Sequence, residues 1–209
     1  LAELQYGGTD EWVKHFNFLL PYFKDSRYIK IDNKPLFGIF HQDNKCKILK
    51  KMIALWNDLA LQNGFNGVYI IGQTNVHGSK CSDVEFDYQP PRAGWANKNF
   101  LDRIINRLTD RNKKLKYDYD AVWMNILKNA KSDSKKNVLY GAFVNYDDSP
   151  RRGNKGKIVI GSTPEKFGKY MVELLKISKE KNKEFIFLTA WNEWGEGAYL
   201  EPEEENGYA

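Results

Sequence analysis

Glu193 and Glu196, two glutamates three residues apart, are the residues of this chain best suited to catalysis. They lie in residues 191–197, which read Trp-Asn-Glu-Trp-Gly-Glu-Gly and follow an apolar run. Two carboxyl groups can break a glycosidic bond, one by handling a proton and the other as base or nucleophile. The flat indoles of Trp191 and Trp194 suit a sugar ring, and the two glycines leave room for a ligand. The combination favours a carbohydrate site over a solvated turn beside core tryptophans.

The two carboxyl groups can act on one bond only if the backbone turns between them. In an extended strand they would lie far apart and on opposite faces. If the strand ends at Trp194 and Gly195 opens a tight turn, the α-carbons of Glu193 and Glu196 approach to within about 7 Å. A carboxyl separation of about 5–5.5 Å would then indicate retention of configuration, and about 6.5–9.5 Å inversion. Burial between the two indoles would raise the pKa of one carboxyl, as a general acid requires.

Other polar and aromatic residues lie near the ends of predicted strands and extend the candidate site. Asn192 can bind a sugar hydroxyl or orient Glu193, with a simple turn role as the alternative. Arg151 can hold a carboxylate or sugar oxygens through its planar guanidinium, or form a surface ion pair. The remaining candidates are Asp147, Glu85, Tyr88 and Tyr199, with Asp87 beside them, Glu201-Pro202 at the rim, and Trp95 as either a lid or a core aromatic.

The apolar spacing predicts an α/β protein in which strands and helices alternate. Strands are expected at 34–40, 67–73, 84–88, 138–144 and 185–191; helices at 9–22 and 45–62 and after Thr163; a loop plus helix within 92–137; and a loop at 146–163. This order requires parallel strands with helices outside. About five strands are visible, and a complete (β/α)8 barrel needs eight in roughly 250 residues. We therefore expect one domain, 1–209, forming a partial TIM barrel without its N-terminal strands.

An open, doubly wound sheet would also fit the alternation, but the sequence contains no nucleotide-binding glycine motif to support it. If N-terminal strands are missing, the strands at 34–40 and 185–191 should present unpaired edges, unless residues 1–9 or another chain cover them. The first residue, Leu1, is not Met, and we interpret the sequence as starting within a longer polypeptide.

Composition excludes several classes of function. The 32 basic and 27 acidic residues give a net charge of +5, and the basic residues are dispersed, which favours a solvated surface over nucleic-acid binding. No apolar run approaches a membrane-spanning length. His15, His41 and His77 are isolated, so we expect no metal site. The separated Cys46 and Cys81 favour free thiols in a reducing compartment over a disulfide, which predicts a cytoplasmic protein, or one held peripherally at the inner membrane.

Three segments resemble the WbsX-type proteins, glycosyltransferases or lipopolysaccharide-biosynthesis proteins of bacterial surface-polysaccharide clusters, which are related to the endo-α-mannosidases of glycoside hydrolase family 99. These segments are residues 20–37 (LPYFKDSRYIKIDNKPLF), 146–153 (YDDSPRRG) and 189–202 (TAWNEWGEGAYLEP). The second segment departs from the family pattern, because Tyr146 replaces Trp and Asp148 replaces Asn. This puts sugar stacking at that loop in doubt.

The resemblance implies a (β/α)8 barrel of which this chain is the later portion. It also implies a retaining mechanism without a sugar bound to the enzyme, in which the substrate's own 2-hydroxyl attacks the anomeric carbon. Glu193 would take the proton of that hydroxyl, and Glu196 would serve as acid and then base. No cofactor is implied, and the partners would be a carbohydrate and the missing N-terminal part of the polypeptide.

Three classes of function compete at this stage. The chain can be a glycan-processing enzyme, a carbohydrate-binding module without catalysis, or a structural fragment of a larger polysaccharide-biosynthesis protein. The Glu193–Glu196 pair favours the enzyme, because binding alone does not need two acids at this spacing. Glycosyl transfer and hydrolysis both stay open, because an acceptor hydroxyl can replace water.

Overall fold

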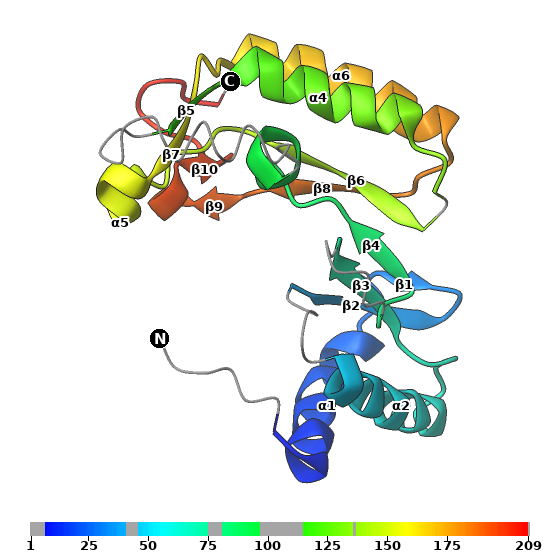
Figure 1. The fold of residues 1–209 in the computed structure, drawn as a ribbon. Coiled ribbons are helices and arrows are strands. Elements are labelled where there is room, and N and C mark those ends of the chain that lie inside the picture. Colours follow the sequence, from blue (N-terminus) through cyan, green and yellow to red (C-terminus); the bar gives the residue numbers. More distant parts are fainter. Residues whose placement is uncertain (1–6, 41–45, 75–80, 97–114, 136, 209) are drawn as a thin grey trace. The chain divides into compact units, whose positions relative to one another are not determined.

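The computed structural model describes residues 7–40, 46–74, 81–96, 115–135 and 137–208. His41 and His77 lie outside these residues, as do the amphipathic positions that the sequence places in 97–114. Contacts divide the chain into two compact units, residues 1–85 and 86–209, and each is described by itself (Figure 1).

The N-terminal unit contains the first two predicted helices and strands. Its elements are α1 (Thr9–Lys24), β1 (Lys30–Ile31), β2 (Lys34–Ile39), α2 (Cys46–Gln62) and β3 (Tyr69–Gln73). β2 and β3 pair in parallel, from Leu36 opposite Tyr69 to Ile39 opposite Gly72, so their predicted orientation is confirmed. β3 begins two residues later than predicted.

Trp56 of α2 forms the centre of this unit's core. Its side chain is fully buried, and its indole N–H donates to the backbone carbonyl of Trp12 on α1 over 3.0 Å. The rings of Phe16 and Phe37 meet the indole edge to face, with centroids 5.9 and 5.0 Å away. His15 also packs against Trp56, so this histidine belongs to the packing of α1 on α2.

The expectation that the strand at 34–40 has a raw edge is wrong over its first residues. β1 pairs with β2 in antiparallel orientation, Lys30 opposite Pro35 and Ile31 opposite Lys34. Asp32 and Asn33 connect the two strands with φ angles of 50° and 58°, which suits the tight two-residue turn of a hairpin. A strand of only two residues has too little alternation to be recognised in the sequence.

The C-terminal unit contains the remaining elements, and β4 (Val84–Phe86) spans the boundary. They are η2 (Arg92–Ala96), β5 (Leu115–Asp118), α4 (Tyr119–Ser132), β6 (Val138–Phe143), α5 (Ser149–Arg152), η3 (Gly153–Lys155), β7 (Lys157–Ile160), α6 (Pro164–Glu180), β8 (Ile186–Thr189), β9 (Asn192–Glu193), η4 (Trp194–Glu196) and β10 (Ala198–Tyr199). β6 and β8 are parallel neighbours, as predicted. β8 ends at Thr189, two residues before the predicted end.

Helices α4 and α6 lie side by side and cover β6 and β8 (Figure 1). Trp123 of α4 is fully buried and stacks between Tyr170 of α6, 5.5 Å away, and Phe143 of β6, 5.6 Å away. Asp118 caps the start of α4, and Thr163 caps α6 ahead of Pro164, as the sequence predicts.

The prediction of a loop over the whole of residues 146–163 is wrong. It contains β7, which pairs in parallel with β5, and the short helix α5. β7 is also hydrogen-bonded to the chain just before α5, because the backbone N–H of Val159 donates to the Tyr146 carbonyl over 2.8 Å. The strand was missed because it has four residues and lies between Gly156 and Gly161, in a segment rich in turn-forming residues.

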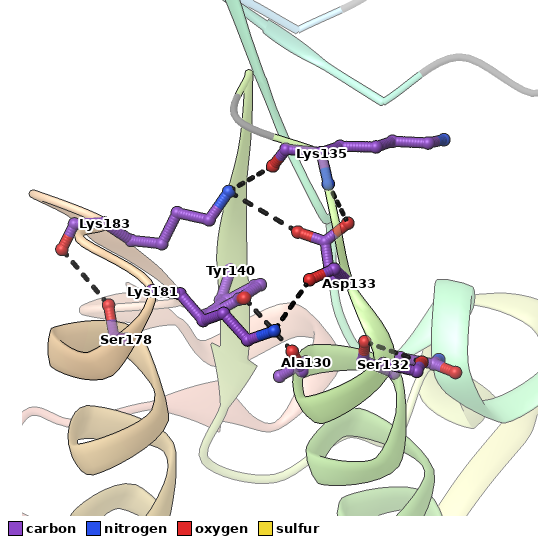
Figure 2. A network of polar contacts seen from close by, with 9 residues as sticks. Ala130, Ser132, Asp133, Lys135, Tyr140, Ser178, Lys181 and Lys183 are labelled. Carbon is purple, nitrogen blue, oxygen red and sulfur yellow. Dashed lines mark hydrogen bonds and ion pairs between the residues drawn. The ribbon is translucent and has the colours of Figure 1, made fainter.

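A polar network joins the connections that lead into β6 and β8 (Figure 2). The ammonium of Lys183 lies 3.4 Å from the Asp133 carboxylate and donates to the backbone carbonyl of Lys135. Lys181 donates to the Asp133 carbonyl over 3.0 Å. The side chain of Lys183 is only 4% exposed, so these contacts fix both connections at the amino ends of the two strands.

Candidate functional site

The glutamate pair lies on a tight turn that follows β8. β9 and β10 form a small antiparallel hairpin, with Glu193 opposite Ala198. Between them η4 makes one 3-10 turn that ends at Gly197, whose φ of 58° and ψ of 20° are left-handed. The expected turn is therefore present, but Trp194 belongs to the turn and Gly197, not Gly195, adopts the conformation that favours glycine.

Both glutamates lie near the phenol of Tyr88. Burial raises the pKa of Tyr88, and the negative charges of Glu196 and Glu193 raise it further. Glu193 is exposed, whereas the side chain of Glu196 is 12% exposed. The two carboxylates thus belong to one neighbourhood at the carboxyl end of β8, where parallel α/β proteins collect their chemistry.

Arg151 reaches this neighbourhood from the loop that follows β6. Its guanidinium forms an ion pair with an oxygen of the Glu196 carboxylate. The backbone N–H of Asp147 donates to the Glu196 carbonyl over 2.6 Å, and a Cβ on Gly197 would lie 3.5 Å from that nitrogen. The loop therefore holds both the backbone and the carboxylate of Glu196.

Two aspartates shape this loop from inside. Asp147 accepts a hydrogen bond from the backbone N–H of Ser149 over 2.8 Å, which starts the turn into α5. Asp148 is 1% exposed; it accepts from the backbone N–H of Lys157 over 2.6 Å and pairs with Arg152 at 2.9 Å. In the sequence Asp148 stands out only as a departure from the family loop, although an Asp-Asp-Ser-Pro run is a typical turn signal.

The aromatic residues of the turn do not enclose the glutamates as expected. Trp191 and Trp194 are 61% and 50% exposed. Trp194 stacks on Tyr199 with ring centroids 3.8 Å apart, and its indole N–H donates to Glu201 over 2.6 Å. One face of Trp194 is thereby occupied by Tyr199, while the exposed Trp191 offers apolar area to a ligand.

The remaining candidates divide between the two units. Glu85 is buried and belongs to the N-terminal unit, whereas Asn192 is exposed on β9. Asp87 pairs with Arg92 at 2.6 Å. Trp95 packs against the buried core through Tyr117 and Tyr146, which favours its core role over that of a lid.

Tyr146 is itself 5% exposed, so it does not present a stacking face for a sugar. Burial and then the charge of Glu196 raise the pKa of its hydroxyl.

The described residues contain neither a metal-binding cluster nor a membrane-spanning helix. No group of three or more His, Cys, Asp or Glu side chains in that part of the chain could hold a metal ion. None of the helices in those same ranges is both long and apolar enough to cross a membrane.

Solved structures of similar fold include glycoside hydrolases. The GH99 endo-α-mannosidase from Bacteroides thetaiotaomicron, in complex with bis-tris propane, superposes with a TM-score of 0.55 and 18% identity over 98% of this chain and 60% of that chain. A glycoside hydrolase-like protein gives a TM-score of 0.55 and 13% identity over 93% of this chain and 54% of its own. The chain thus has an α/β fold similar to that of these proteins and spans a little over half their length.

Sequence comparison leads to a family. The uncharacterized protein WxcX of Xanthomonas campestris pv. campestris is 22% identical over 198 residues, which is 90% of this chain and 27% of WxcX. The chain therefore spans about a quarter of that relative. The glycosyltransferase WbsX family matches all of residues 1–209, and the chain belongs to this family.

Proposed function

We propose that this chain is the later part of a (β/α)8 barrel in a carbohydrate-active enzyme that cleaves or transfers glycosidic bonds. The observation that carries the proposal is the placement of Glu193 and Glu196 on one turn after β8, with both charges acting on Tyr88. Membership of the WbsX family and the fold shared with a GH99 endo-α-mannosidase support it. The single-domain boundary of 1–209 and a cytoplasmic location stay predictions.

In the proposed reaction the two glutamates have different tasks. Glu193, the more exposed, takes the proton of the substrate's 2-hydroxyl as that oxygen attacks the anomeric carbon. Glu196 gives a proton to the leaving oxygen, and the attack of the 2-oxygen closes a three-membered ring on the sugar. In the second step Glu196 activates a water or an acceptor hydroxyl, which attacks the anomeric carbon and opens that three-membered ring. Two inversions at the anomeric carbon give net retention.

Arg151 sets a condition on this cycle. Its ion pair forms with ionised Glu196, whereas a general acid must carry a proton. Substrate binding must therefore move the guanidinium off this oxygen before the leaving group departs. Because Arg151 is 58% exposed, its side chain has room to turn toward a sugar oxygen.

The second candidate function is carbohydrate binding without catalysis. The exposed Trp191, together with Asn192 on the hairpin, favours it, because an open indole and a nearby amide suffice to hold a sugar. Hydrolysis and transfer differ only in the acceptor, so the same residues serve both.

The decisive experiment changes each glutamate in the protein that carries this chain and measures turnover of an α-mannoside with a poor and with an aryl leaving group. Glu196→Gln removes the proton donor, so turnover of the poor leaving group should fall by about 10²–10⁴-fold. The aryl leaving group needs little protonation and should largely restore the first step. Glu193→Gln removes the base, and neither leaving group should restore activity.

Glu180→Gln, at the end of α6, is the matched control and should keep wild-type turnover. Wild-type turnover in the double Glu193→Gln, Glu196→Gln variant would reject catalysis by this pair. If the wild type binds the sugar but turns over no substrate, and the double variant turns over none either, the binding function is supported instead.

A further inference from the structure

The two cysteines of the chain, 35 residues apart in the sequence, lie together in the N-terminal unit. Cys81 belongs to the buried core of this unit, and the partly buried Cys46 packs against the same core. The two side chains interact, because Cys46 raises the pKa of the Cys81 thiol. Neither cysteine forms a disulfide in this structure. Their separation along the chain suggested two unrelated thiols, whereas the fold brings them into contact.

We propose that Cys46 and Cys81 form a reversible disulfide, a modification site that restrains the chain segments after β2 and β3. Cys46 is the first residue of α2, which follows β2, and Cys81 lies between β3 and β4. β2 and β3 are parallel, so their carboxyl ends lie at the same edge of their sheet. The bond would therefore tie together two connections at the carboxyl ends of neighbouring strands.

The surroundings of the two sulfurs give the reaction an order. Cys46 is partly exposed, while Cys81 is 9% exposed, so an oxidant reaches Cys46 first. Burial raises the pKa of Cys81 to about 12, with a further rise from its hydrogen bond to Cys46; Lys50 acts in the opposite direction and Glu85 in the same one. Cys81 is thus a neutral thiol at ordinary pH and a slow nucleophile, so it reacts only in the second step, where the attack is intramolecular.

With glutathione disulfide as the oxidant, the atoms balance in two exchanges. The sulfur of Cys46 attacks one sulfur of glutathione disulfide, which forms a mixed disulfide and releases one glutathione. Cys81 then loses its proton to solvent, and its thiolate attacks the Cys46 sulfur and releases the second glutathione, which takes up a proton. One disulfide bond is formed in the protein and one is broken in the oxidant.

The test uses the 209-residue chain in glutathione buffers of increasing oxidising strength. Alkylation of remaining thiols after denaturation, followed by mass spectrometry, counts the free thiols and any attached glutathione. We expect the wild type to lose both thiols together with no glutathione attached and to stay monomeric on a non-reducing gel. Closing a loop of this length should also raise the Tm by roughly 5–10 °C.

Two single variants separate this bond from general thiol oxidation. Cys81→Ser should stop at the mixed disulfide and retain one glutathione on Cys46, whereas Cys46→Ser should react much more slowly. Retention of both thiols under strong oxidant, stable glutathione on the wild type, or a disulfide-linked dimer would each overturn the proposal. None of these outcomes depends on the glutamate site, so the proposed function stands or falls separately.

Discussion

Two carboxylate–cation pairs lie at opposite ends of β6 and β8 in the C-terminal unit, and they differ in how far the cation is fixed. At the amino ends, Lys183 is 4% exposed and Asp133 14% exposed (Figure 2). At the carboxyl ends, Glu196 is 12% exposed but its partner Arg151 is 58% exposed. Asp133 and Glu196 are thus similarly exposed, but the cation beside Asp133 is enclosed and the cation beside Glu196 is open to solvent.

The surrounding contacts explain this difference. The Lys183 ammonium also donates to the Lys135 carbonyl and lies 5.5 Å from the centre of the Tyr140 ring. The first contact holds the connection between α4 and β6, and the second places the ammonium against β6 itself. The guanidinium of Arg151, in contrast, sits on a helix of four residues next to the hairpin turn. We interpret the amino-end pair as a structural contact. Under the proposed function the carboxyl-end pair can rearrange when a sugar binds, because α/β barrels place their chemistry at the carboxyl ends of the strands.

The largest effect on stability should follow from breaking the amino-end pair. Lys183→Met leaves the Asp133 carboxylate without its cation and should lower the free energy of unfolding by about 2–4 kcal/mol, because removing one member of a buried pair strands the other. Arg151→Met should cost less than about 1 kcal/mol, since Arg151 is mostly exposed. Urea unfolding followed by tryptophan fluorescence measures both values.

A second substitution tests the reason for that loss. Adding Asp133→Asn to Lys183→Met removes the stranded charge and should recover part of the lost stability. Equal losses for Lys183→Met and Arg151→Met would show that the two ends of the strands do not differ in the way their exposures indicate.

The elements with a regular apolar pattern were predictable from the sequence. β2, β3, β6 and β8 each contain a short run of mostly apolar residues. The helices α2 and α6 bury residues spaced three or four apart on one face. β1 has only two residues, too few for alternation to show, although its partner β2 follows at once through a hairpin turn. β5 and β7 have four residues each and pair with each other although they are distant in the sequence. Their formation is decided by tertiary pairing, which a local pattern does not contain.

The candidate site shows the same division. Glu193 and Glu196 could be singled out because they lie within seven residues that have little use in packing. The contact between Arg151 and Glu196 joins residues 45 positions apart, and the sequence left a sugar contact and a surface pair open as alternatives. The Asp133–Lys183 pair gave no signal, because an aspartate and a lysine after two helices are ordinary surface residues until the fold buries them.

A smaller effect is expected from changing Trp191, which is exposed beyond the carboxyl end of β8. Trp191→Ala removes an indole that is 61% exposed, so KM or the Kd for a sugar should rise about tenfold while the Tm stays unchanged. Sugar titration followed by calorimetry measures the first and thermal unfolding the second. Tyr208→Ala, which removes an aromatic ring that is 95% exposed, is the control and should alter neither. A lower Tm in Trp191→Ala would instead assign the indole to packing.

The smallest effect concerns the pH dependence of the amino-end network. Burial raises the pKa of Tyr140 to about 12, with smaller contributions from the charges of Asp133 and Asp87. The folded protein therefore holds this proton more tightly than the unfolded chain, whose tyrosines titrate near 10. The resulting stability is fully present below about pH 10 and is lost as the pH rises toward 12.

Tyr140→Phe removes that titration along with the hydrogen bond to the Ala130 carbonyl. Between about pH 9 and 11, the wild type should lose about 1 kcal/mol more unfolding free energy than the variant does. Tyr208→Phe serves as the control, because its exposed ring should leave the wild-type slope unchanged. Parallel pH profiles for the wild type and Tyr140→Phe would mean that Tyr140 titrates as freely as an exposed tyrosine, and that the amino-end network is more open to water than its low exposure indicates.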